Sequence, residues 1–287
     1  MRRAVPWFDL AFGVLVPGAG LLLLAVGIEE TGPLSFIGWR TLLLAIPGIL
    51  LARPTRIAWR DAIPASLALM FGLGMLGYAL DGGDLVTVGV VTVTIALTMA
   101  PMILALSCLT LPGLPETMGA LGGLGTLVVL ASTTGMGPDA WLATASGIGF
   151  ATAVVLSERV IHDHPAPTIV MPALGMAGLI LLGAGVVLGE AWLPTRDTIP
   201  VLVVTGLVTG LLAMLARWRG AEVLGVKLAR PAMGLEMIGV VAVAAWFGSG
   251  WPSTELGVAA VVGLLASAAP AWGTNRLSET ELFSAGR

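Results

Sequence analysis

Residues 85–107 read LVTVGVVTVTIALTMAPMILALS, an apolar run without a charged side chain. A run of this length matches the ~20 residues that an α-helix needs to cross the ~30 Å hydrocarbon core of a bilayer. The whole chain shares this character, because 57% of its 287 residues are hydrophobic, 11% are charged and the mean hydropathy is +0.98. A water-soluble domain could not hide so much apolar surface. The sequence therefore predicts an all-α integral membrane protein.

Ten apolar segments of similar length follow one another along the chain. They lie at about 9–28, 33–51, 62–80, 85–107, 117–134, 139–160, 168–189, 198–218, 223–247 and 254–272. The first follows Met1-Arg2-Arg3 and has a signal peptide as its alternative reading. We expect an uncleaved helix, because the run is longer than a signal core of about 7–15 residues and Glu29-Glu30 follow without a small-residue cleavage site.

The basic residues predict which side of the membrane each loop faces, since cytoplasmic loops retain Lys and Arg. With the N-terminus inside, the cytoplasmic side collects Arg2, Arg3, Arg53, Arg56, Arg60, Arg159, Arg217, Arg219, Arg276 and Arg287. Among loop residues, Arg196 alone falls outside. We therefore expect a multi-pass protein of a bacterial plasma (inner) membrane, with both termini in the cytoplasm.

Two short motifs recur in the second half of the chain. Arg60-Asp61-Ala62-Ile63-Pro64 opens the third segment, and Arg196-Asp197-Thr198-Ile199-Pro200 opens the eighth; Pro33 and Pro167 open the second and seventh at nearly the same offset. This pattern indicates a duplication. Because each half has an odd number of spans, the halves are inverted, an architecture common in secondary transporters. The predicted units are residues 1–136 and 137–275, with a cytoplasmic tail at 276–287.

Four charged residues fall inside predicted spans: Arg40, Lys227, Arg230 and Glu236. A charge at the bilayer centre costs about 2.5–3.5 kcal/mol on insertion scales, so it normally faces a cavity or a partner. Lys227 and Arg230 lie near the cytoplasmic end of their segment and can snorkel to the headgroups. Arg40 and Glu236 come out at a similar, central height when each residue adds about 1.5 Å.

These central charges suggest a binding site for a small solute. The Arg40 guanidinium fork suits a carboxylate, and Glu236 suits an ammonium group, so a zwitterionic amino acid would satisfy both. A buried carboxylate also invites proton exchange, which makes Glu236 the candidate for proton coupling. The alternative is that the two residues pair with each other, or with a buried carbonyl, and only hold the halves together.

Further candidates for the site carry hydroxyl, aromatic or cationic groups: Trp39, Tyr78, Thr94, Thr98 and Arg230. For the threonines the alternative is a hydrogen bond within their own helix, and for the aromatic residues it is packing. No catalytic residue, cofactor or metal site is expected: Cys108 is the single cysteine, and the two histidines share one loop. Basic residues form no patch for nucleic acid. The GxxxG spacings at 119–123, 185–189 and 206–210 favour packing within a monomer over a homodimer.

Several motifs together resemble the drug/metabolite transporter superfamily, in particular its EamA-type metabolite and amino-acid exporters. They are Phe36-Ile37-Gly38-Trp39-Arg40, Thr98-Met99-Ala100-Pro101, Pro115-Glu116-Thr117 before the Gly-rich segment from Gly119, and Leu235-Glu236. Two positions depart from the family pattern: Met237 replaces a proline, and Gly248-Ser249-Gly250-Trp251 lacks a second glutamate. The resemblance implies ten helices as two inverted five-helix repeats and export of an amino acid, metabolite or amine.

The function that the sequence favours is therefore secondary transport of a small organic solute across the membrane. An intramembrane enzyme would need a nucleophile with a base, or a metal cluster, at membrane depth, and we find neither motif in the spans. A scaffold without transport would have no use for costly central charges. A channel would more typically show rings of pore-lining residues in an oligomer.

Overall fold

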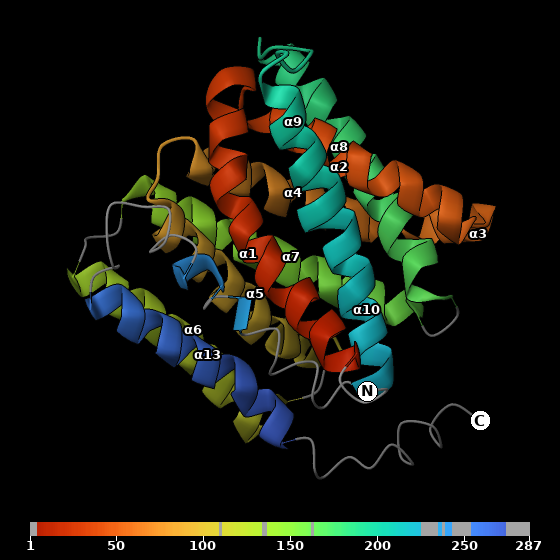
Figure 1. The fold of residues 1–287 in the computed structure, drawn as a ribbon. Coiled ribbons are helices and arrows are strands. Elements are labelled where there is room, and N and C mark those ends of the chain that lie inside the picture. Colours follow the sequence, from red (N-terminus) through yellow and green to blue (C-terminus); the bar gives the residue numbers. More distant parts are fainter. Residues whose placement is uncertain are drawn as a thin grey trace.

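The computed structural model describes residues 5–108, 111–133, 137–161, 164–224, 235–236, 239–242 and 254–273. Within these ranges every regular element is a helix (Figure 1). The helices are α1 (Val5–Thr31), α2 (Pro33–Ala52), α3 (Arg56–Asp61), α4 (Ile63–Leu80), α5 (Leu85–Ser107), α6 (Leu114–Thr133), α7 (Pro138–Ile161), α8 (Ala166–Val187), α9 (Thr198–Val203), η1 (Val204–Leu212), α10 (Ala213–Leu224) and α13 (Thr254–Gly273).

Eight helices in the described part of the chain are long and apolar enough to cross a membrane. They are α1, α2, α4, α5, α6, α7, α8 and the continuous unit Thr198–Gly220 formed by α9, η1 and α10. The last helix, α13, holds a shorter apolar stretch at Gly257–Ala266. The predicted all-helical character with multiple apolar helices is confirmed to this extent. The ninth predicted segment, 223–247, lies largely outside the described residues.

Polar side chains define where several helices begin. The Asp84 carboxylate accepts hydrogen bonds from the backbone N–H of Thr87 at 2.9 Å and from its hydroxyl at 2.6 Å, which caps α5. Thr55 caps α3 by accepting the N–H of Ala58 at 3.2 Å. Pro33 starts α2, where its missing N–H has no helical partner to lose. The starts of α2 and α5 therefore coincide with predicted segment boundaries, whereas α3 is a short helix in a region between two predicted segments.

Closely approaching glycines hold the helices together. Gly38 of α2 lies against the backbone of Gly178 and Leu182 in α8, and Gly149 of α7 lies against Gly72 of α4. A Cβ on Gly38 would come within 2.8 Å of the Leu182 nitrogen. Small residues permit such backbone contact in lipid, where no hydrophobic drive brings helices together. Further packed pairs are α1 with α10, α5 with α7, and α6 with α13 (Figure 1).

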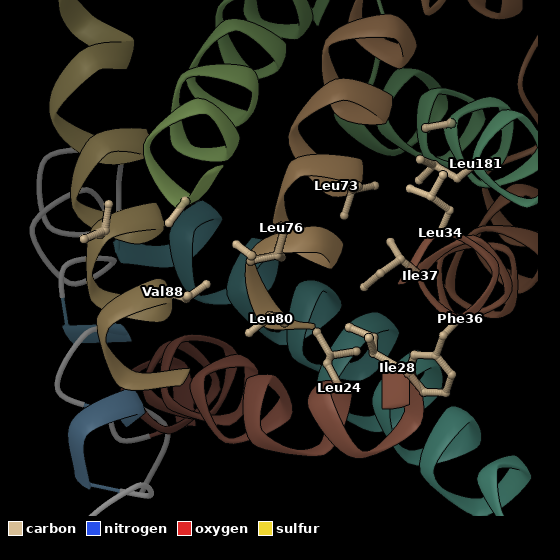
Figure 2. Close-up of a cluster of buried hydrophobic side chains, with 14 of the residues drawn as sticks. Leu24, Ile28, Leu34, Phe36, Ile37, Leu73, Leu76, Leu80, Val88 and Leu181 are labelled. Carbon is tan, nitrogen blue, oxygen red and sulfur yellow. The ribbon is translucent and has the colours of Figure 1, made fainter. Parts of the chain in front are cut away.

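The apolar core includes the junction of α1, α2 and α4 and extends to α5 and α8 (Figure 2). Leu24 and Ile28 of α1 point toward Ile37 of α2 and Leu80 of α4, and Phe36 fills the space left beside Gly27. Phe36 and Ile37 have no exposed surface. This core fixes the register of α2, which carries Arg40 one turn further along.

The loop after α8 forms hydrogen bonds with the end of α1 and the start of α2. The Glu190 carboxylate accepts the backbone N–H groups of Leu34 at 3.2 Å and Ser35 at 2.6 Å, so it caps the N-terminus of α2. Thr195 donates to Glu30 at 2.8 Å. A carboxylate is favourable at this helix end because the first N–H groups are otherwise unpaired. The cap connects residues 156 positions apart, so sequence proximity gave no signal for it.

Candidate functional site

The carboxylate of Glu236 forms an ion pair with Arg217. Nη2 of Arg217, in α10, lies 2.9 Å from Oε2 of Glu236, and both side chains are largely buried, at 25% and 18% exposure. Nε of Arg217 also donates to the carbonyl oxygen of Gly13 in α1 at 3.0 Å. Arg217 therefore joins three helical segments, α1, α10 and the stretch containing Glu236.

The sequence did not identify Arg217 as a site residue. It stands at the end of the apolar segment 198–218, a position where arginine usually reaches the headgroups. In the structure Gly13 faces the backbone of Arg217, so α1 and α10 are in close contact at this level. The long side chain is thus held in the bundle by the Gly13 carbonyl and the Glu236 carboxylate. Sequence spacing contains no information about such neighbours.

Arg40 occupies the other part of the candidate site. Its Nε is buried and has no hydrogen-bond partner, a rare state for a charged group in a packed protein. The Glu236 carboxylate is near enough to attract it electrostatically, although the two residues form no ion pair within 4.0 Å among the contacts of the described chain. Arg40 and Glu236 therefore lie in one region of the structure, but the residue that forms the ion pair with Glu236 is Arg217.

A π-helix lies beside Arg40. In η1, Gly206 faces the backbone carbonyl of Arg40 and the side chain of Leu43, and Gly210 faces Leu44. On another side of η1, Thr209 packs against Gly20 of α1. π-Helical turns inside α-helices are uncommon and are frequently found at functional sites. The apolar pattern of 198–218 gave no signal for this change of helical pitch.

The remaining predicted site residues lie in several places. Trp39 donates from Nε1 to the carbonyl of Trp192 at 2.9 Å, and their rings meet edge to face at 6.0 Å, so Trp39 contacts the loop after α8. Tyr78 is in the last turn of α4 and is 37% exposed. Arg230, like Lys227, lies outside the described residues.

Thr94 and Thr98 are buried on α5. The hydroxyl of Thr98 donates to the carbonyl of Thr94 at 2.7 Å, which is the hydrogen bond within one helix considered above as the alternative to solute binding. The Thr98 side chain also faces Gly123 of α6. Its contacts in this structure are therefore with α5 and α6.

The described residues contain no group of three or more His, Cys, Asp or Glu side chains that could hold a metal ion. Four of the GxxxG glycines face neighbours on other helices or on their own: Gly123 faces Thr98, Gly185 faces Ser35, Gly206 faces Leu43 and Gly210 faces Leu44. Gly189, after the end of α8, has no atom within 4 Å of its Cβ position. The neighbours of Gly123, Gly185 and Gly206 lie on other helices of the chain, so these glycines allow close packing of helices.

No protein-family model matches the sequence, and neither does any curated protein. Among solved structures, one described as "Crystal structure of protein" is similar, with a TM-score of 0.65 and 18% sequence identity. The match covers 96% of this chain and 100% of that chain. At this identity the likeness shows the fold alone.

Proposed function

We propose that this chain is a secondary transporter that moves a small organic solute, an amino acid or a related metabolite or amine, across a bacterial inner membrane. The observation that carries the proposal is Arg40, a guanidinium with a buried, unpartnered Nε in a bundle of apolar helices. Such a group is costly to a protein that only needs to be stable. It becomes useful when a solute supplies the missing partner.

The proposed architecture is ten membrane helices in two inverted five-helix repeats. Helix packing supports it, because exchanging the two halves exchanges the predicted segments one and six, two and seven, three and eight, and five and ten. Under that exchange the contact of α4 with α7 becomes the contact of α10 with α1, and both are extensive. The pairs α2 with α8 and α6 with α13 map onto themselves.

The family proposed is the EamA-type branch of the drug/metabolite transporters, on the strength of the sequence motifs around Arg40, Pro101, Glu116 and Glu236. Export is the proposed direction, and it comes from this resemblance. Exchange of a proton on Glu236 is the proposed coupling. The site would comprise Arg40, Glu236 and the further candidates named above, with no cofactor, and the molecule would act as a monomer or homodimer.

Solute counterflow tests transport directly. Purified protein in proteoliposomes loaded with a mixture of unlabelled amino acids should accumulate radiolabelled amino acid transiently, whereas Arg40→Gln should not. Arg196→Gln is the matched control, because Arg196 is an exposed loop arginine. Absence of counterflow in the unaltered protein contradicts transport and favours a membrane scaffold or an intramembrane enzyme without transport. Equal counterflow in Arg40→Gln contradicts the role of Arg40 in solute binding.

Proton coupling has a separate test. We expect Glu236→Gln to keep counterflow but to lose the acceleration of net transport by an imposed pH gradient. If the pH gradient drives the variant as strongly as the unaltered protein, Glu236 does not carry the coupling proton.

A further inference from the structure

The carboxylate that could receive a solute's amino group is already engaged. Glu236 accepts a charge-assisted hydrogen bond from Arg217 at 2.9 Å, and Arg217 is held in turn by the Gly13 carbonyl at 3.0 Å. A solute ammonium would have to displace this guanidinium or share the carboxylate with it. Nearby positive charge on Arg217 also repels an ammonium group.

Arg40 is in the opposite situation. Its Nε is buried without a hydrogen-bond partner, and it forms no ion pair with another described residue. Arg40 and Arg217 each contribute one positive charge, and Glu236 contributes one negative charge. The described cluster therefore retains one positive charge, located on Arg40. The buried Nε of Arg40 has no hydrogen-bond acceptor, and Glu236 is already paired with Arg217, so an anion bound at Arg40 would be stabilised.

We infer that the solute is recognised through a carboxylate bound at Arg40 and needs no amino group, so that the substrate class is small organic monocarboxylates. This inference rests on the proposed function and narrows it. The planar guanidinium presents paired N–H donors that match the two oxygens of a carboxylate. One net positive charge matches a singly charged carboxylate better than a doubly charged phosphate. Arg217 is a positioning residue, since its ion pair occupies the Glu236 carboxylate.

Binding by shape-matched probes tests the charge that is recognised. Isovalerate, valine and isobutylamine share a branched carbon skeleton but are anionic, zwitterionic and cationic at pH 7. We expect isovalerate to raise the unfolding temperature of the purified protein at least as much as valine, and isobutylamine to leave it unchanged. Ligand stabilisation follows mass action, so weak binding registers at high concentration. A series from acetate to hexanoate, with the matched amines, covers other chain lengths.

Several outcomes overturn the inference. They are stabilisation by an amine, stabilisation by valine without stabilisation by isovalerate, and no stabilisation by any carboxylate of the series. Arg40→Gln should weaken carboxylate binding about 10- to 100-fold, as expected for a lost charge-assisted hydrogen bond. Arg40→Lys keeps the positive charge and is the variant to measure if Arg40→Gln does not fold. An equal affinity in Arg40→Lys contradicts the role of the guanidinium fork.

Counterflow with the same three probes separates this inference from the proposed function. Carboxylate binding without counterflow supports the anion site and refutes transport. Counterflow of isobutylamine, but not of isovalerate, supports transport and refutes the anion site.

Discussion

Neutralising one partner of the Arg217–Glu236 ion pair should destabilise the protein more than the contact itself is worth. Removing one member of a buried pair leaves an uncompensated charge and typically costs about 3–5 kcal/mol, whereas exposed pairs contribute about 0–1 kcal/mol. The Arg217 and Glu236 side chains are 25% and 18% exposed, so we expect each single variant to lower the free energy of unfolding by about 2–4 kcal/mol. Arg217→Gln should lie at the upper end. Glu236→Gln should lie at the lower end, because Arg217 keeps its bond to Gly13.

The double variant Arg217→Gln/Glu236→Gln should be less destabilised than the sum of the singles, with a coupling energy of about 1–3 kcal/mol. Equilibrium unfolding in mixed micelles of dodecylmaltoside and SDS, followed by tryptophan fluorescence, measures all three variants. Arg219→Gln is the control, since Arg219 is exposed on the same helix. Single effects that add to within about 0.5 kcal/mol would show that the two groups do not interact and would remove the basis for an occupied Glu236.

Three more predictions concern the helix cap, the helix contacts and the topology. Glu190→Ala should lower the free energy of unfolding by about 1–3 kcal/mol, because two charge-assisted hydrogen bonds to α2 are lost. Glu29→Ala, at an exposed carboxylate, should change it little. Equal effects of the two variants in the same unfolding assay would contradict the cap. Gly38→Val should lower the free energy of unfolding by about 1–3 kcal/mol, because the added side chain forces α2 away from α8. Gly183→Val should be tolerated, because no atom lies within 4 Å of the Gly183 Cβ position. The unfolding midpoints of the two variants test this difference. The exposed Cys108 follows α5 and should react with a membrane-impermeant maleimide in inside-out vesicles only; labelling confined to right-side-out vesicles would reverse the proposed orientation.

Helix positions followed from the sequence with good precision. The run 85–107 that decides the fold class coincides with α5, and the segments 33–51 and 62–80 coincide with α2 and α4 within about two residues. The reason is physical: lipid supplies no hydrogen-bond partners, so an apolar run must satisfy its backbone internally as a helix. The π-helical η1 was not predictable in this way, because both helix types satisfy the backbone and share the same apolar composition.

Candidate charges also followed from the sequence, since a charged residue far from the ends of an apolar segment stands out by its cost. Arg40 was identified in this way, and in the structure its Nε is buried without a hydrogen-bond partner. The partner of Glu236 was decided by tertiary structure alone. Arg217 stands at a segment end, and only the close approach of α1 and α10 at Gly13 directs its side chain to the carboxylate. The depth of a residue in the membrane depends on its position along one helix, which the sequence shows. The pairing of side chains depends on which helices are in contact, and an apolar sequence does not specify those contacts.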